Sequence, residues 1–380
     1  MKARRGPLSG IRLIEMAGIG PAPMCGMVLS DLGADILRID RPTPSDVGIK
    51  RPMETNFILR GRQTIRINLK TDAGRALVLR LLREADGMFE GFRPGVMERL
   101  GLGPDPALTA NPALVYGRVT GWGQAGPMAH MAGHDLTYLA LTGALAAMGR
   151  KGELPPVPLN LIGDFAGGAL FLAVGMLSAL VSARKTGCGQ VVDAAIVDGV
   201  ATMLSSVNGL RQAGVFRTEA GTNILDGGAY FYDIYRCADG GYVAIGPIEP
   251  KFFADFIQRL GIDISALPPQ ADDARWPEGR AFLAGVFATR ARDAWTQVFA
   301  GTDACVAPVL SIEETFHDPH LVARGTFQEI DGRPQATPAP RFDKTPPDIP
   351  HAPINARAED ALADWLPAGE IRHFLSSIGD

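Results

Sequence analysis

Two side chains in the first half of the sequence could transfer protons, and one of them is His134 in the segment MAGHDLTYLAL. An imidazole ordinarily titrates at about pH 6.5, so it can take or give a proton at neutral pH. Gly133 precedes the histidine and an apolar helical pattern follows it, which predicts a loop-to-helix junction at His134. The alternative interpretation is a structural histidine without a role in proton transfer.

Asp164 is the second candidate, in the segment NLIGDFAGG just ahead of an uncharged helical pattern. A carboxylate in that place is an ordinary N-cap. Its neighbours are nearly all apolar or glycine, however, and such surroundings raise a carboxyl pKa toward the range of a general acid or base. Asn160, four residues earlier, could hold the carboxyl group by a hydrogen bond. Glu249 precedes Pro250 in AIGPIEPKFF, at a strand-to-helix junction where glutamate is not a preferred cap.

The first predicted strand-to-helix turn resembles the start of a dinucleotide-binding fingerprint. Gly18 and Gly20 lie in this turn, and Asp40 ends the next predicted strand about twenty residues later. The third glycine is absent, and Pro21 and Pro23 remove amide donors that a pyrophosphate would need. A structural turn is the favoured interpretation of these glycines when they are taken alone, so this signal is weak.

Basic side chains follow several of the predicted strands. Arg41 comes directly after Asp40, where a guanidinium group suits a phosphorylated ribose such as that of coenzyme A or NADP. Three further cations, Lys70, Arg93 and Arg99, come near the carboxyl ends of neighbouring strands, where open α/β sheets bind ligands. Together they could clamp a polyphosphate, although Arg99 could also be a solvated neighbour of Glu98 on a helix surface.

Composition excludes several classes of protein. With 46% hydrophobic and 21% charged residues, the 380-residue chain is neither disordered, collagenous nor a coiled coil. A net charge of −4 argues against a nucleic-acid partner, although residues 1–118 hold 18 lysines and arginines against 12 acidic residues. The four cysteines lack disulfide or metal-ligand spacing, so we expect no metal and a cytoplasmic location. The uncharged stretch 165–181 is short for a membrane span, and we expect a buried helix and no membrane contact.

Strand and helix patterns alternate over the first 200 residues, which predicts an α/β fold with a parallel sheet. A helix capped by Thr71 or Asp72 is expected to run to about Ala85. Near Gly221 the pattern changes to an antiparallel hairpin with a turn at 238–241, which begins a smaller domain. Helical patterns, a Pro-rich stretch with the composition of a linker and an amphipathic tail follow, at 251–261, 276–301, 332–353 and 359–379.

Long segments of the chain together resemble the family III CoA-transferases, and within that family its α-methylacyl-CoA racemase branch. The segments that carry this resemblance occur in order over about residues 7–330. They include PLSGIRLIEMAGIGPAP, SDLGADILRIDRP, FRPGVMERLGLGP, TGWGQAGP, AGHDLTYLALTG, PLNLIGDFAGGALFL, GQVVDAAIVDG, YRCADGGYVAIGPIEPKFF and TDACVAPVL.

The resemblance implies an interlocked homodimer with active sites between the large domain of one subunit and the small domain of the other. It implies a Rossmann-like large domain over 1–195 completed by 338–380, a linker over 196–224, a small α+β domain over 225–319 and a return linker over 320–337. It assigns His134 and Asp164 as catalytic bases, Asn160 as support for Asp164, and Glu249 of the partner subunit beside His134. The residues placed at coenzyme A are Ile19, Arg41, Ile67, Lys70, Arg93, Arg99 and Asp135.

The activity implied by the resemblance is interconversion of R and S 2-methylacyl-CoA thioesters in fatty acid metabolism, by 1,1-proton transfer through an enolate. Such an inversion needs a base on each face of the α-carbon. No separate cofactor is expected, because coenzyme A is part of the substrate. Three alternatives remain: a family III CoA-transferase with Asp164 as nucleophile, an acyl-CoA-binding protein without turnover, and an NADP-linked oxidoreductase.

Overall fold

The structure is a computed structural model that describes residues 4–43 and 48–378. Contacts divide the chain into two units. The larger comprises Met1–Thr142, Pro158–Met203 and Val322–Asp380, and the smaller comprises Gly143–Val157 and Leu204–Leu321. The linker boundaries expected from the resemblance, at 196–224 and 320–337, stay predictions.

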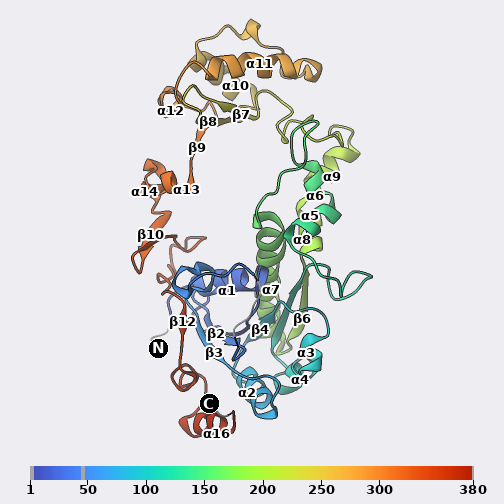
Figure 1. The fold of residues 1–380 in the computed structure, drawn as a ribbon, viewed down its shortest axis with the longest axis vertical. Coiled ribbons are helices and arrows are strands. Elements are labelled where there is room, and N and C mark those ends of the chain that lie inside the picture. Colours follow the sequence, from blue (N-terminus) through green and yellow to red (C-terminus); the bar gives the residue numbers. More distant parts are fainter. Residues whose placement is uncertain (1–3, 44–47, 379–380) are drawn as a thin grey trace. The chain divides into compact units, whose positions relative to one another are not determined.

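The larger unit is built on a seven-stranded sheet, formed within the described residues and drawn in Figure 1. Its strands are all parallel and run in the order β12-β3-β2-β1-β4-β5-β6. The inner order 3-2-1-4-5-6 is that of doubly wound nucleotide-binding sheets, which confirms the predicted α/β fold with a Rossmann-like large domain. The strands are β1 (Arg12–Met16), β2 (Asp35–Asp40), β3 (Gln63–Arg66), β4 (Gly87–Glu90), β5 (Val115–Thr120), β6 (Gln190–Ala195) and β12 (Ile354–Asn355).

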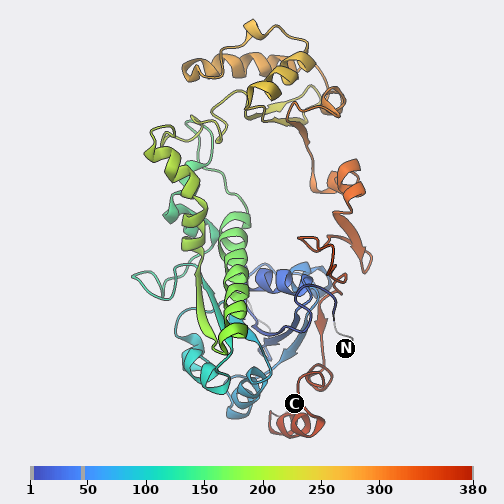
Figure 2. The same cartoon turned by 180° about the vertical axis from the view of Figure 1, so that it is seen from behind.

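Helices cover both faces of this sheet because successive strand residues, such as Leu13 and Ile14, point into two different cores. One core lies under α1 (Pro21–Asp31) and α7 (Phe171–Thr186), the long helix that Figure 2 shows from behind. The other lies under α2 (Asp72–Leu82), α4 (Pro104–Ala110), α15 (Ala358–Leu362) and α16 (Ala368–Ile378). The remaining helices of this unit are α3 (Val96–Arg99), α5 (Asp135–Thr142) and α8 (Ile196–Met203), and α14 (Pro319–Arg324) crosses the unit boundary.

Local signals set the ends of several helices. The Thr71 hydroxyl accepts the Gly74 N–H at 3.1 Å, which caps α2 as predicted. The expected amphipathic tail is two helices, α15 and α16, because Pro367 interrupts the pattern between them. Within the expected return linker 320–337, β10 (Phe327–Ile330) and β11 (Arg333–Ala336) form a hairpin, and the Ala336 carbonyl accepts a 2.8 Å hydrogen bond from Arg60.

The helix expected after Asp164 begins earlier than predicted. A π-helical segment spans Leu161–Leu170 and continues into α7, so Asp164 lies inside a helix rather than at its N-cap. Glycines permit this wide turn to pack closely, since a Cβ at Gly167 would lie 2.7 Å from the Val200 side chain of α8. π-Helical turns occur frequently at functional sites.

The segment Leu161–Thr186 is long and apolar enough, by length and composition, to cross a membrane. That criterion is weak, because core helices of soluble proteins also meet it. Leu172, Met176 and Leu180 belong to the core formed with α1 and the strands. The absence of membrane contact stays a prediction.

The smaller unit contains a three-stranded antiparallel sheet of β7 (Asp233–Arg236), β8 (Tyr242–Ile245) and β9 (Val306–Val309). The turn between β7 and β8 falls at the predicted hairpin. An aromatic-rich core joins this sheet to α10 (Pro250–Leu260), α11 (Trp276–Phe287) and α12 (Arg292–Phe299). The unit also holds the short helices α6 (Ala144–Ala147), α9 (Ser205–Gln212) and α13 (Ile312–Thr315).

Candidate active site

The predicted ligand-binding cations follow the carboxyl ends of adjacent parallel strands. Arg41 follows β2, Lys70 follows β3 and Arg93 follows β4, while Arg99 ends the short helix α3. All four side chains are exposed, and none makes an ion pair within the described parts of the chain. The Glu98 carboxylate pairs with Arg118 at 2.8 Å, not with Arg99. Free cations at this edge are suited to bind an anionic ligand.

A buried carboxylate orders the loop that bears Arg93. Glu90, the last residue of β4, accepts the Phe92 N–H at 2.6 Å and pairs with Arg118 at 3.0 Å. Burial raises the pKa of Glu90 to about 7, and the Phe92 amide and Arg118 oppose that rise. These bonds fix the chain immediately before Arg93.

Two residues expected at coenzyme A are hydrophobic and differ in exposure. Ile19, in the turn after β1, is 43% exposed, whereas Ile67 is 1% exposed and packs in the core of the sheet. The Ile67 N–H also bonds to the Asp40 carbonyl at 2.8 Å. Of Ile67, therefore, only the backbone carbonyl is left for a ligand.

The Asp164 carboxyl group lies among polar and apolar neighbours that set its protonation. Burial raises the pKa of Asp164 to about 6, and the charge of Asp135 adds to the rise. A side-chain hydrogen bond with Asn160 and the charge of His134 act in the opposite direction. The structure thus brings His134, Asn160 and Asp164 together, as the sequence predicts, and their catalytic roles stay predictions.

His134 stands immediately before α5, at the predicted loop-to-helix junction. Its N–H donates to the Thr137 hydroxyl at 3.0 Å, and that hydroxyl donates to the His134 carbonyl at 2.7 Å. The two bonds fix the backbone while the imidazole remains exposed. A histidine on a fixed backbone with a solvent-exposed ring is suited to exchange protons with a ligand.

The Asp135 side chain is buried and hydrogen-bonded within the protein. It is 6% exposed, and its Oδ1 accepts the backbone N–H of Asp164 at 2.6 Å. Burial raises the pKa of Asp135, while the amides of Asp164 and Gly163 act against the rise. The expectation that Asp135 binds coenzyme A is therefore left to its backbone, because the carboxylate is already engaged inside the protein.

Glycines allow this close packing around the two carboxyl groups. Gly20 has a φ of 68°, and a Cβ there would lie 3.0 Å from Asp164 Oδ2. A Cβ on Gly163 would lie 2.5 Å from Asp135 Oδ1. The turn that contains Gly18 and Gly20, which resembles the start of a dinucleotide-binding fingerprint, thus lies with Gly20 against the Asp164 carboxyl group.

Sequence reasoning missed Tyr138, a buried residue of α5. Its pKa is raised to about 12 by burial first and then by the charge of Asp164, while Arg93 opposes the rise. Its spacing from His134 could have identified it, because residues four apart lie on one face of a helix and His134 directly precedes α5. Tyr138 therefore lies within the electric field of the site and packs edge-on against Trp122.

Glu249 belongs to the smaller unit, where it precedes α10 and is exposed. It does not cap the helix with its side chain. Its charge contributes to a raised pKa of Cys305, after burial. The expected contact between His134 and Glu249 of the partner subunit stays a prediction.

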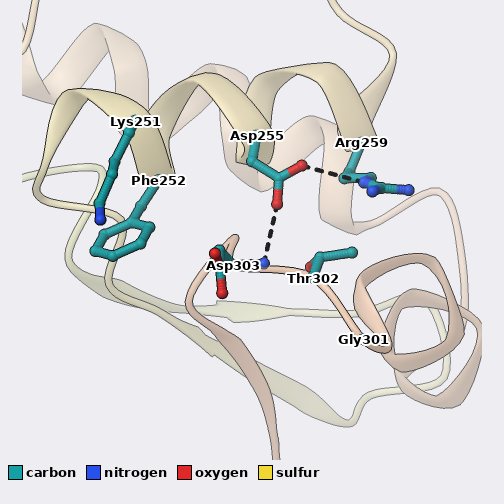
Figure 3. A pocket seen from close by; sticks show the side chains of 7 residues that line it. All are labelled: Lys251, Phe252, Asp255, Arg259, Gly301, Thr302 and Asp303. Atoms are coloured by element: carbon teal, nitrogen blue, oxygen red, sulfur yellow. Dashed lines mark hydrogen bonds and ion pairs between the residues drawn. The ribbon is translucent and has the colours of Figure 1, made fainter.

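Two hollows in the smaller unit offer less chemistry. One, of about 340 Å³ and drawn in Figure 3, is lined by Lys251, Phe252, Asp255, Arg259 and residues 301–303. Three of its charged side chains are already engaged: Arg259 pairs with Asp255 at 3.2 Å, and the Lys251 ammonium group lies over the Phe252 ring. The other, of about 630 Å³, includes residues 233–234 of β7 and 244–245 of β8. Within the described residues no cluster of three His, Cys, Asp or Glu side chains could hold a metal.

The carboxyl edge of this doubly wound sheet carries exposed cations together with an imidazole and a carboxyl group. These features define an α/β protein that is equipped for acid–base chemistry on an anionic ligand. The chain belongs to CoA-transferase family III, whose model matches residues 8–356. It is 43% identical over 341 residues to the alpha-methylacyl-CoA racemase of Mus musculus, covering 89% of this chain and 87% of that protein. It is 42% identical over 364 residues to the Homo sapiens racemase, covering 94% and 93%.

Other relatives extend the comparison within the family. A succinyl-CoA–D-citramalate CoA-transferase of Chloroflexus aurantiacus is 33% identical, covering 84% of this chain and 82% of that protein. The crystal structure of a CAIB/BAIF family protein from Brucella suis matches with a TM-score of 0.81 and 25% identity, covering 97% and 99%. The family likeness therefore extends over nearly the whole chain.

The raised pKa of Asp164 predicts how its replacement changes stability. The folded pKa of about 6 exceeds the ordinary aspartate value of 3.8, so ionisation costs folding free energy between those pH values and above. Asp164→Asn is neutral throughout, and we expect it to be more stable than the native protein at pH 8 by roughly 2 kcal/mol. At pH 4.5 the gain should fall to about a third of that value, because the unfolded carboxyl group is still mostly ionised there. Thermal unfolding at both pH values measures the difference, and the exposed Glu329→Gln should show none.

Proposed function

We propose that this protein interconverts the R and S epimers of 2-methylacyl-CoA thioesters. The observation that carries the proposal is the pairing of His134 with a half-buried Asp164 whose pKa is raised to about 6. Asp164 can then hold or release a proton near neutral pH, beside the imidazole of His134. The two racemases that are 42–43% identical over most of the chain support this reaction.

The reaction moves one proton off the α-carbon and another onto its opposite face. Neutral His134 takes the proton from the S epimer, which leaves an enolate, and protonated Asp164 gives its proton to the other face. From the R epimer the roles exchange. The backbone N–H of Asp135, in the first turn of α5, is suited to stabilise the enolate oxygen, because first-turn amides lack a helical acceptor.

The exposed cations are proposed to bind the phosphates of the coenzyme A moiety. We expect Arg93→Ala to raise KM about tenfold with little change in kcat, because the phosphates do not take part in the reaction. The effect should shrink at high ionic strength. Steady-state kinetics at low and high salt measure both, with the exposed Arg184→Ala on α7 as control. A loss confined to kcat would contradict this assignment.

A homodimer in the cytoplasm is the proposed state of the protein. The dimer is supported by an apolar surface along the segment 161–186, where Leu170, Val174 and Val181 are 45–62% exposed. In this proposal the partner supplies its own Glu249 to orient His134. Light scattering should give twice the chain mass of 40.4 kDa, and a single-chain mass would refute it.

The alternative within the family is CoA transfer, in which Asp164 attacks the thioester and forms a mixed anhydride. The relative named as a CoA-transferase is consistent with that reading, although it is less similar to this chain than the two racemases. One experiment separates the two: the S epimer of a 2-methylacyl-CoA is incubated with the protein, with and without a free carboxylate acceptor. Approach to equal R and S amounts in both tubes supports the racemase, whereas a new thioester on the acceptor supports the transferase.

A further inference from the structure

One side chain joins the two segments that carry the proton-transferring groups. Asp135 directly follows His134, and its Oδ1 accepts the backbone N–H of Asp164 at 2.6 Å. The neighbouring Gly163 amide also favours the ionised form of this carboxylate. A Cβ on Gly163 would lie 2.5 Å from Oδ1, so glycine is required where the two segments meet. The start of α5 is thus held to the π-helical turn by a buried carboxylate.

We infer that Asp135 is a positioning residue that sets the separation of His134 and Asp164 through its bond to the Asp164 amide. The inference rests on the proposed function and deepens it. A charged acceptor makes stronger hydrogen bonds to amides than a neutral one, which explains why a carboxylate is kept at 6% exposure here. Because Oδ2 has no hydrogen-bond partner among the described residues, the bond from the Asp164 amide to Oδ1 holds the group in place.

The same carboxylate influences the protonation of Asp164. The charge of Asp135 raises the pKa of Asp164, after burial, while Asn160 and His134 lower it. From α5, Tyr138 also interacts electrostatically with both carboxyl groups, and Arg93 acts on Tyr138. From α1, Gly20 brings only backbone against Asp164. Removing the Asp135 charge should therefore shift the Asp164 titration toward acid.

A simpler role would be that of an acidic residue in the first turn of a helix, where it favours the helix dipole. Asp198 is the matched control, because it lies in the first turn of α8 and is exposed. Asp198→Asn should leave kcat and the pH profile unchanged. If Asp135 acted only through the dipole, Asp135→Asn would behave in the same way.

The test compares Asp135→Asn and Asp135→Ala with the native protein. Asp135→Asn keeps an acceptor oxygen and should retain a well-ordered site, with its exchange–pH profile shifted to lower pH. Asp135→Ala should lose about 10²-fold in kcat with KM unchanged, because a displacement of about 1 Å is enough for such a loss. Native kcat in Asp135→Ala, a change in KM alone, or an unshifted profile in Asp135→Asn would overturn the inference.

A second readout does not depend on activity. The Asp164 amide proton should be strongly protected from solvent exchange in the native protein, less so in Asp135→Asn and unprotected in Asp135→Ala. The native protein could fail to exchange the substrate α-proton while the three proteins still show this graded protection. In that case the proposed function fails, but the role of Asp135 in holding the Asp164 backbone stands. Equal protection of the Asp164 amide in all three proteins would refute this role of Asp135. The role would also be refuted if a variant that melts like the native protein lost protection at all of its amides and not at Asp164 in particular.

Discussion

Replacement of His134 by alanine should abolish α-proton exchange from the S epimer while exchange from the R epimer continues. Loss of a positioned general base typically costs about 10²–10⁴-fold in rate. Asp164 remains able to remove the R proton and to return deuterium to the same face. NMR of each single epimer in D₂O measures exchange and inversion separately.

The distinguishing feature of this variant is exchange without inversion. We expect deuterium in the R epimer but no S product, because no acid remains on the other face. Thr137→Val is a useful companion, since Thr137 fixes the His134 backbone through two hydrogen bonds without reaching the reacting atoms. It should slow exchange from the S epimer and inversion in both directions, while exchange from the R epimer continues. Unchanged exchange from both epimers in His134→Ala would remove the histidine from the mechanism.

Asp164→Asn should give the mirror image, with exchange from the S epimer retained and exchange from the R epimer lost by a similar factor. Asparagine has nearly the same shape and can still accept a hydrogen bond from Asn160, but it carries no proton that titrates. Inversion should stop in both directions. The same variant should remain folded and gain stability at pH 8, so lost activity cannot be ascribed to unfolding.

The pH profile of native R-epimer exchange is the companion measurement for Asp164. Exchange that starts from the ionised carboxylate should rise with pH through about 6, where the raised pKa of Asp164 lies. Asn160→Ala should move that midpoint upward, because the hydrogen bond from Asn160 favours the ionised form. Exchange from the R epimer that survives in Asp164→Asn would assign the base to another group.

The parallel sheet could be predicted because its information is local. Strands buried on both faces are continuous apolar runs, and the turns between them carry glycine or proline. The same pattern placed Arg41, Lys70 and Arg93 at strand ends, so one common edge followed from topology alone. His134 and Asp164 were identifiable from their residue types and from the resemblance of whole segments.

The rest of the site depends on contacts between distant segments, which no local pattern records. Asp135 looked like a ligand residue, yet its carboxylate is used inside the protein because Gly163 leaves space for it. Asp164 looked like an N-cap, yet glycines at 163, 167 and 168 permit a π-helical turn around it. Ile67 looked available to coenzyme A, yet its side chain is needed by the core beneath β3.

A single incubation of native protein tests the central claim most directly: one pure epimer of a 2-methylacyl-CoA in D₂O, with the α-position followed by NMR and the epimer ratio by chiral analysis. Two proton carriers on opposite faces predict that deuterium enters the α-position as the ratio approaches one. Retention of the original α-proton by a folded protein that binds the thioester would contradict that arrangement.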